Sequence, residues 1–145
     1  MKDVIEKSLY IIKPSLLNHN INIVKEYNSD EEIKLYDAEM MHVVLNILNN
    51  SKEHLKEKEI KEPYIKITTE NRTISICDNA GGIPEDIKDK IFDPYFSTKD
   101  EKNGTGLGLY MSKTIVEKHH HGKVSVENVE NGVCFAIELV MLSKK

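Results

Sequence analysis

Stretches of helical and strand periodicity alternate along the whole chain. Apolar residues recur every three or four positions near residues 3–18, 38–58 and 106–119, which predicts three helices, and a short helix is expected near 85–90. Between them, β-branched and aromatic residues alternate with polar ones, as is typical of strands. The expected strands cover residues 21–27, 33–36, 64–70, 73–78, 123–128 and 132–141.

Pairs of strands separated by helices favour a two-layer α/β sandwich. Short polar turns at Asn71–Arg72 and Asn131–Gly132 predict hairpins, so most neighbouring strands should run antiparallel. The expected fold class is therefore α/β, with a mixed, mostly antiparallel sheet and helices on one face. A single domain over residues 1–145 is expected, because this length is close to that of a typical domain.

The composition is that of a globular protein, with 39% hydrophobic and 30% charged residues. The net charge of −4 argues against a nucleic-acid partner, because such a partner requires clustered basic side chains. No apolar run approaches the roughly 18 residues that are needed to cross a bilayer, and no signal peptide is evident. We therefore expect no membrane contact by this domain.

Neither the cysteines nor the histidines follow a metal-binding pattern. Cys77 and Cys134 lack the spacing of a metal site and fall in expected strands, so we expect reduced cysteines in the core of a cytoplasmic protein. The histidines at 119–121 are adjacent at a helix end and point in different directions, which prevents three ligands from converging. We expect them to cap the last helical turn instead.

The first candidate site joins an expected strand to a glycine-rich bend. Asp78 closes the strand, and Gly81 and Gly82 follow closely. A carboxylate can accept a hydrogen bond from an amino group, and a backbone without Cβ atoms lets a flat ring approach. An adenine would fit, with its amine on Asp78 and its face on Gly82 and Ile83. An ordinary turn is the alternative, because Asp, Asn and Gly are also common turn residues.

The second candidate site is a polar stripe on the helix expected at 38–58. Asn46, Asn50 and Glu53 recur at i, i+4 and i+7, roughly opposite the apolar stripe. An amide oxygen suits a Mg²⁺ ion that already carries phosphate charge, since Mg²⁺ keeps several waters and takes few protein ligands. Simple solvation of the asparagines is the alternative. The apolar stripe is expected to comprise Met41, Val44, Leu45 and Leu48.

A second glycine-rich segment opens the helix expected at 106–119. Free N–H groups converge at such a helix N-terminus and the helix dipole favours negative charge, so this segment can bind phosphate. It is not a P-loop, because no Gly-Lys-Ser/Thr follows, and not a Rossmann fingerprint, because a polar loop precedes it. A flexible hinge is the alternative. The segment reads Gly104-Thr105-Gly106-Leu107-Gly108-Leu109.

An aromatic loop at Phe92–Lys99 lies between the two glycine-rich segments. With this loop and the features above, the chain resembles the ATP-binding catalytic domain of two-component sensor histidine kinases. That group shares its nucleotide-binding fold with gyrase-type topoisomerases, heat-shock chaperone ATPases and mismatch-repair ATPases. Four boxes occur in the family's order and cover residues 41–109. Asn46 and Asn50 match the N box, residues 78–83 the first glycine box, Phe92–Lys99 the F box and Gly104–Leu109 the second glycine box.

The resemblance implies a Bergerat-type fold with Mg-ATP between sheet and helices. Asn50 would ligate Mg²⁺, with Asn46 and Glu53 beside it in catalytic positions. The γ-phosphoryl group would pass to a histidine on a separate dimerisation domain of the same full-length, homodimeric protein, and then to a response regulator. The nucleotide would be bound by Asp78, Gly82, Ile83, Tyr95, Phe96, Lys99, Gly104, Thr105, Gly106, Leu107 and Gly108.

Several positions depart from the family pattern. Ala80 replaces the first glycine of the first box, Glu53 stands where Lys or Arg is common, and Cys134 stands where Thr is frequent. None of the six histidines has the family's phosphoacceptor context. The chain therefore resembles an excised catalytic fragment, without phosphoacceptor, dimerisation or sensor domains, or a module whose acceptor lies on another chain.

Two other functions remain open at this point. An anti-sigma-type serine kinase has the same fold and phosphorylates a serine on a partner protein. A non-catalytic nucleotide-sensing module would instead regulate a partner through lid closure over the nucleotide. The encoded sequence upstream of Met1 would discriminate between the kinases, because a dimerising helical pair with an acceptor histidine identifies the histidine kinase.

Overall fold

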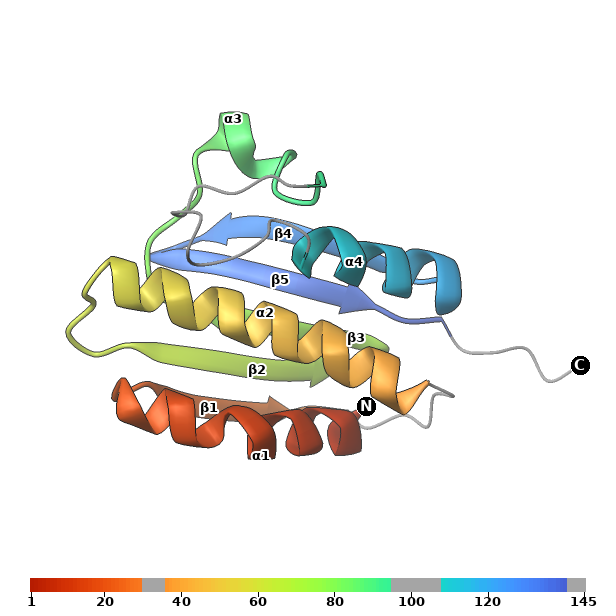
Figure 1. The fold of residues 1–145 in the computed structure, drawn as a ribbon, viewed down its shortest axis with the longest axis horizontal. Coiled ribbons are helices and arrows are strands. Elements are labelled where there is room, and N and C mark those ends of the chain that lie inside the picture. The colour runs from red at the N-terminus through yellow and green to blue at the C-terminus, as the bar shows by residue number, and fades with distance from the viewer. Residues whose placement is uncertain (30–35, 95–107, 141–145) are drawn as a thin grey trace, which may run out of the picture.

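The computed structural model describes residues 1–29, 36–94 and 108–140. A layer of helices covers one face of a five-stranded sheet (Figure 1). The elements are α1 (Lys2–Asn18), β1 (Asn22–Tyr27), α2 (Asp37–Glu57), β2 (Tyr64–Glu70), β3 (Thr73–Asp78), α3 (Glu85–Lys88), α4 (Gly108–Thr114), the π-helix η2 (Ile115–His119), β4 (Lys123–Val129) and β5 (Gly132–Glu138).

The sheet has the order β1-β2-β3-β5-β4, with β1 parallel to β2 and every other pair antiparallel. The expected α/β sandwich with helices on one face is therefore confirmed, as are both hairpins. Asn71 and Asn131 adopt the left-handed backbone conformation that these tight turns require. The strand expected at 33–36 falls mostly outside the described residues, and Tyr36 directly precedes α2.

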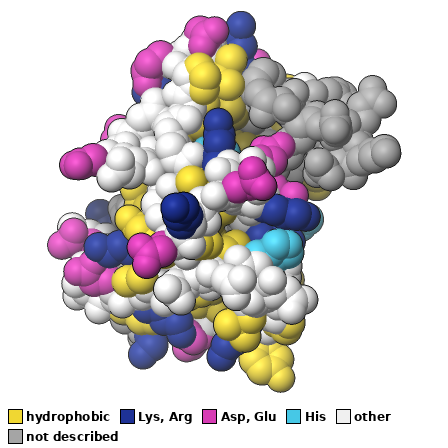
Figure 2. Space-filling view, turned by 90° about the vertical axis from the view of Figure 1, so that its left-hand side faces the viewer, with side chains coloured by type: hydrophobic (Ala, Val, Ile, Leu, Met, Phe, Trp, Pro, Cys, Tyr) yellow, Lys and Arg dark blue, Asp and Glu magenta, His cyan; other side chains and the backbone are white. Residues whose placement is uncertain are grey.

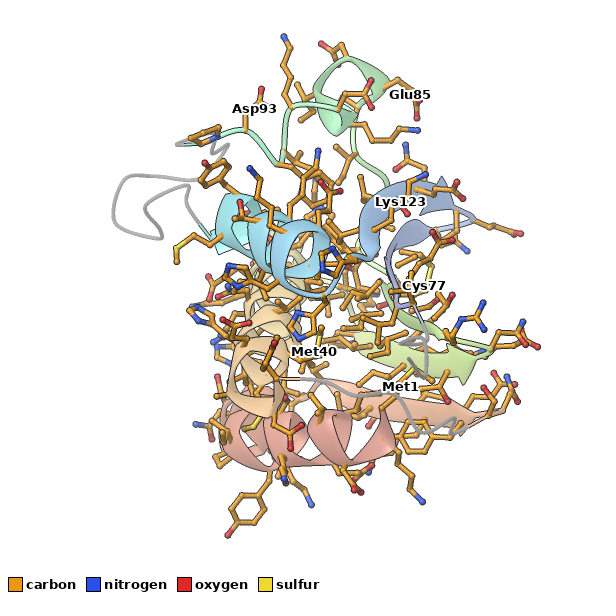
Figure 3. The ribbon with its side chains drawn as sticks, turned by 90° about the vertical axis from the view of Figure 1, so that its right-hand side faces the viewer. Met1, Met40, Cys77, Glu85, Asp93 and Lys123 are labelled. Atoms are coloured by element: carbon orange, nitrogen blue, oxygen red, sulfur yellow. A yellow bond between two sulfur atoms is a disulfide. The ribbon has the colours of Figure 1, made fainter. Side chains whose placement is uncertain are left out.

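The hydrophobic core lies between the sheet and the helices. Along β2, β3 and β5 every second side chain is buried, as expected for strands with one covered face. Burying each large aliphatic side chain stabilises the fold by about 1.5–3 kcal/mol. Met40 points from α2 into this layer (Figure 3). The fully buried strand residues include Ile65, Ile67, Ile74, Ile76, Phe135 and Ile137.

The buried face of α2 is wider than the sequence pattern indicated, and it is turned by one residue. Met41 and Leu45, which were expected in the apolar stripe, are only partly buried. The cause is that α2 packs against α1 and α4 as well as against the sheet. More than one side of the helix is therefore covered. Its buried residues are Met40, Val43, Val44, Ile47, Leu48, Ser51 and Leu55.

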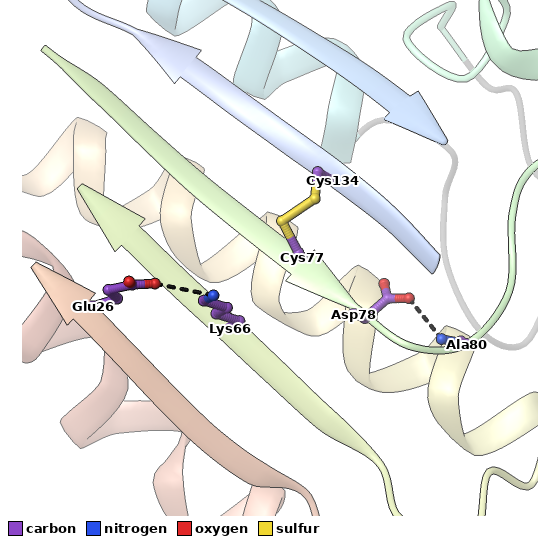
Figure 4. The surroundings of a disulfide bond; sticks show 6 residues. All are labelled: Glu26, Lys66, Cys77, Asp78, Ala80 and Cys134. Atoms are coloured by element: carbon purple, nitrogen blue, oxygen red, sulfur yellow. Dashed lines mark hydrogen bonds and ion pairs between the residues drawn. A yellow bond between two sulfur atoms is a disulfide. The ribbon is translucent and has the colours of Figure 1, made fainter. Parts of the chain in front are cut away.

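The expectation of reduced cysteines in the core is wrong. Cys77 on β3 and Cys134 on β5 lie directly opposite each other and form a disulfide (Figure 4), with Cα atoms 4.0 Å apart. Their neighbours Ile76 and Asp78 point into the core, so the alternation of the strand directs Cys77 to the uncovered face of the sheet. Both cysteines are consequently only partly buried.

None of the helices that the structure describes is both long enough and apolar enough to span a lipid bilayer.

Candidate functional site

A hollow of about 460 Å³ lies where the C-terminal half of α2 faces the segment after β3 and the start of α4. The helix side of the hollow is polar and the other walls are mainly apolar. Figure 2 views this end of the molecule, where acidic and basic side chains are interspersed on the surface. The lining includes Asn50, His54, Gly82, Ile83, Ile91 and Leu109.

Asp78 is a buried carboxylate next to the hollow-lining residue His54, with a side chain that is 2% exposed, and it does not itself line the hollow. Its Oδ1 accepts a hydrogen bond from the Ala80 N–H at 3.0 Å (Figure 4). Gly132 on β5 approaches the Asp78 carbonyl so closely that a Cβ atom at position 132 would overlap with it. The end of β3, and with it the carboxylate, is therefore fixed from both sides.

His54 lies beside this carboxylate, with Nδ1 3.7 Å from Asp78 Oδ1, and it also lines the hollow. His54 is not among the site residues predicted from the sequence. Its position was nevertheless readable, because His54 follows Asn50 by four residues and so shares its helix face. Asn50 and His54 therefore place an amide and an imidazole along one side of the hollow, with the Asp78 carboxylate next to His54, and polar atoms of a ligand can be bound there.

The bend after Asp78 explains how Ala80 can replace the first glycine of the family pattern. Gly81, and not residue 80, adopts the left-handed conformation, with φ of +87°, and its N–H donates to the Asn131 carbonyl at 3.0 Å. Ala80 instead buries its methyl group in the core. The glycine that the turn requires is thus supplied one position later than in the family pattern.

The polar stripe on α2 does not converge on one point. Asn50 lines the hollow, whereas Asn46 spans to the neighbouring helix, its Nδ2 donating to the Gly108 carbonyl at 3.3 Å and to Ser112 Oγ at 3.1 Å. Glu53 lies beside Lys52, with Oε2 and Nζ 3.7 Å apart. Asn46 therefore links α2 to the first turn of α4.

The donor set fits a Mg²⁺ ion that arrives with a nucleotide. Asn50 places an amide on the wall of the hollow. No group of three His, Cys, Asp or Glu side chains that could hold a metal ion exists in the described part of the chain. A Mg²⁺ ion that keeps its waters and phosphate ligands needs only one or two protein oxygens, and an asparagine amide can supply one.

The aromatic loop and the second glycine segment are described only at their ends. Phe92 is buried edge-on against Phe135, at 6.2 Å between ring centroids, with Lys113 Nζ 5.6 Å from its ring. Gly108 opens α4 and Leu109 lines the hollow. The other predicted residues of these segments lie outside the described residues, namely Tyr95, Phe96, Lys99, Gly104, Thr105, Gly106 and Leu107.

His119 and His120 make different contacts near the N-terminal end of α2. His120 is buried; its Nε2 accepts from the Tyr36 N–H at 3.1 Å, and its Nδ1 lies 3.2 Å from the Ile115 carbonyl. The contact of Nδ1 with a carbonyl of the last helical turn agrees with the expected capping role for His120. His119 instead contacts Glu39 across the helices, at 3.0 Å.

Comparison with known proteins identifies the family. The model of the histidine kinase-, DNA gyrase B- and HSP90-like ATPases matches residues 36–142. The chain belongs to this ATPase family. The Adaptive-response sensory kinase SasA of Rippkaea orientalis is 29% identical over 143 residues, which cover 95% of this chain and 35% of that kinase. The histidine-protein kinase AtoS of Escherichia coli is 30% identical over 139 residues, covering 94% and 22%.

Solved structures of histidine kinases have the same fold as this chain. The catalytic domain of histidine kinase ThkA has a TM-score of 0.83 at 31% identity, over 95% of this chain and 92% of that domain. ThkA in complex with the response regulator TrrA has a TM-score of 0.79 at 28% identity, over 96% of this chain and 40% of that one. The expected resemblance to histidine kinase catalytic domains is therefore confirmed.

Proposed function

We propose that this chain is the catalytic domain of a sensor histidine kinase that binds Mg-ATP in the hollow beside α2. It donates the γ-phosphoryl group to a histidine on a separate dimerisation domain, for onward transfer to an aspartate of a response regulator. The observation that carries the proposal is the meeting of Asn50, Gly82 and Ile83 in one hollow, with the Asp78 carboxylate beside the lining residue His54. These residues come from two separate boxes of the sequence.

Adenine recognition depends on the first glycine box. Asp78 accepts a hydrogen bond from the adenine amine, because its buried carboxylate has no competing bulk water on the core side. Ile83, Ile91 and Leu109 offer the apolar surface that the faces of the ring require. His54 stands next to Asp78 on the polar side of the hollow and takes part in the same recognition.

The phosphates are bound at the start of α4. Asn50 ligates Mg²⁺, which neutralises phosphate charge when it is bound. Asn46 fixes Gly108 and so orients the first turn of the helix towards the phosphates. Glu53 acts on a water or phosphate network. The backbone of Gly104, Thr105, Gly106, Leu107 and Gly108 supplies N–H donors, Lys99 supplies a cation, and Tyr95 and Phe96 anchor a lid.

Phosphoryl transfer requires little covalent chemistry from the protein and depends on positioning and charge neutralisation. An imidazole nitrogen of the acceptor histidine attacks the γ-phosphorus. The bond from that phosphorus to the β,γ-bridging oxygen breaks, and ADP leaves with the electron pair. Because none of the chain's own histidines has the phosphoacceptor context, the acceptor comes from another domain. We place the reaction in the cytoplasm because ATP is available there, although the Cys77–Cys134 disulfide is unusual for that compartment.

Incubation of this chain with γ-labelled ATP and Mg²⁺ tests the proposal, with and without a dimerisation domain of a related kinase. Alone, the chain should acquire no acid-labile phosphate. In the mixture, acid-labile and base-stable label should appear on the dimerisation domain. Stoichiometric phosphohistidine on the isolated chain would overturn the need for a separate acceptor. Acid-stable label on a serine would favour a serine kinase, and no nucleotide binding at all would contradict both.

A further inference from the structure

Asn128, near the end of β4, contacts the segment that forms the wall of the hollow. Its Oδ1 accepts from the Ile83 N–H at 2.7 Å and its Nδ2 donates to the Ile83 carbonyl at 2.8 Å. The side-chain amide thereby pairs with both backbone groups of Ile83, as a residue of a neighbouring strand would. Its remaining hydrogen is used too, because Nδ2 also lies 2.7 Å from Glu85 Oε2.

The segment from Gly81 to Pro84 has few other supports. It leaves the sheet after β3 and passes the ends of β4 and β5 on its way to α3 (Figure 1). Among the described residues, its backbone–backbone hydrogen bond to the β4–β5 hairpin runs from the Gly81 N–H to the carbonyl of the turn residue Asn131. Gly82, Ile83 and Pro84 all line the hollow. The position of this wall is therefore set by the β4–β5 hairpin, and at Ile83 by Asn128.

The same contact gives a second reason for the glycine at position 82. A Cβ atom there would lie 2.8 Å from Asn128 Oδ1, which is closer than side-chain atoms normally approach. The backbone of Gly82 is not in the left-handed region, so another residue would meet no conformational penalty. Gly82 thus leaves space for the Asn128 amide behind the wall. This role is separate from any space that Gly82 leaves for the ligand.

We propose that Asn128 is a positioning residue for nucleotide binding, which holds Gly82 and Ile83 against the adenine ring without touching the nucleotide itself. The proposal rests on the proposed function of the hollow. It is independent of the family's boxes, because Asn128 lies outside all four of them. It predicts that the affinity for ATP depends on the side-chain amide of Asn128 on β4, although this amide does not contact the nucleotide.

Asn128→Ala should weaken ATP binding about fivefold, because the loss of the hydrogen bonds to Ile83 frees the wall. Asn128→Asp should weaken it at least as much, since a carboxylate would face the Ile83 carbonyl and Glu85. Two controls should bind ATP as the wild type does. Glu85→Gln keeps both contacts to Ile83, and Glu127→Ala removes an exposed neighbour on the same strand.

A double-mutant cycle separates this role from a general loss of stability. Gly82→Ala should weaken ATP binding in the wild-type background, because its methyl group displaces the Asn128 amide. In the Asn128→Ala background the same substitution should cause little further loss. If glycine is needed only for clearance of the ring, Gly82→Ala will lower the affinity by the same factor in both backgrounds, and the proposal is wrong.

Hydrogen exchange at the Ile83 amide gives a readout that needs no nucleotide. In the unliganded protein this amide should exchange about tenfold faster in Asn128→Ala than in Glu127→Ala, while core amides of β3 keep their protection. Wild-type ATP affinity in Asn128→Ala would overturn this proposal alone. A wild type that binds no nucleotide would overturn the proposed function and the role of Asn128 in it.

Discussion

At the scale of single residues, Asp78 is held by contacts of both its side chain and its backbone. Its carboxylate accepts from the backbone of Ala80, and its carbonyl is approached by Gly132 from the next strand. Both contacts orient the end of β3 before any ligand binds. An interaction with a preorganised buried carboxylate is stronger than one in water, because the surrounding dielectric is low.

Asp78→Asn should therefore weaken ATP binding by about 1.5–3 kcal/mol, the usual worth of a hydrogen bond to a charged group. It should also narrow the preference for ATP over GTP, since an amide can donate to the guanine oxygen. Isothermal titration with both nucleotides measures this. Asp3→Asn, at the start of α1, serves as the control and should bind as the wild type does. An unchanged ATP affinity in Asp78→Asn would remove Asp78 from the site.

At the scale of elements, α1 is attached to the edge strand β1 by a polar contact at half-buried positions. Tyr27 Oη donates to Glu6 Oε2 at 2.6 Å, and Lys25 Nζ lies 3.0 Å from the same carboxylate oxygen. The hydrogen bond from Tyr27 and the charge of Lys25 hold the pKa of Glu6 below its ordinary value of 4.5. The ionised carboxylate is thus favoured in the folded state.

This shift gives the contact a defined pH dependence. Because the folded pKa lies below the unfolded one, the contribution to stability is complete above about pH 4.5 and is lost as the pH falls through the folded value. Tyr27→Phe should lower the free energy of unfolding by about 0.5–1 kcal/mol at pH 7, a modest figure because the pair is partly exposed. Urea titrations should show this difference shrinking towards pH 3, and a difference independent of pH would contradict the assignment.

Most elements could be predicted from local patterns, whereas the contacts between distant elements could not. The β2–β3 hairpin follows from alternating residues around Asn71, and α2 from its apolar spacing. The pairing of Cys77 with Cys134 depends on the register of β3 against β5, which no local pattern specifies. The contact of Asn128 with Ile83 could not be predicted either, because an exposed asparagine near a turn is already explained by turn chemistry.

At the scale of the whole molecule, the disulfide links two central strands whose cysteines are 57 residues apart in sequence. Closing a loop of that length restricts the unfolded chain and stabilises the fold by up to roughly 4 kcal/mol. Adding dithiothreitol should therefore lower the unfolding midpoint of the wild type and leave a Cys77→Ser/Cys134→Ser double variant unchanged. An equal response of the two proteins, with free thiols found by mass spectrometry beforehand, would contradict the bond.

The hollow lies at one end of the sandwich, where α2 ends and the segment after β3 begins. The chain spans only 35% and 22% of the length of the kinases SasA and AtoS described above. The proposed function requires that Mg-ATP binds in this hollow with Asn50 as a protein ligand of the metal.

The most direct test is the affinity for ATP with Mg²⁺ and with excess chelator, measured for the wild type and for Asn50→Ala. Chelation should weaken ATP binding in the wild type and have little further effect in the variant. Thermal stability should change by less than about 0.5–1 kcal/mol, because Asn50 lies outside the buried face of α2. A variant that retains the full metal dependence, or that unfolds, would show that Asn50 is a structural amide and that the metal binds elsewhere.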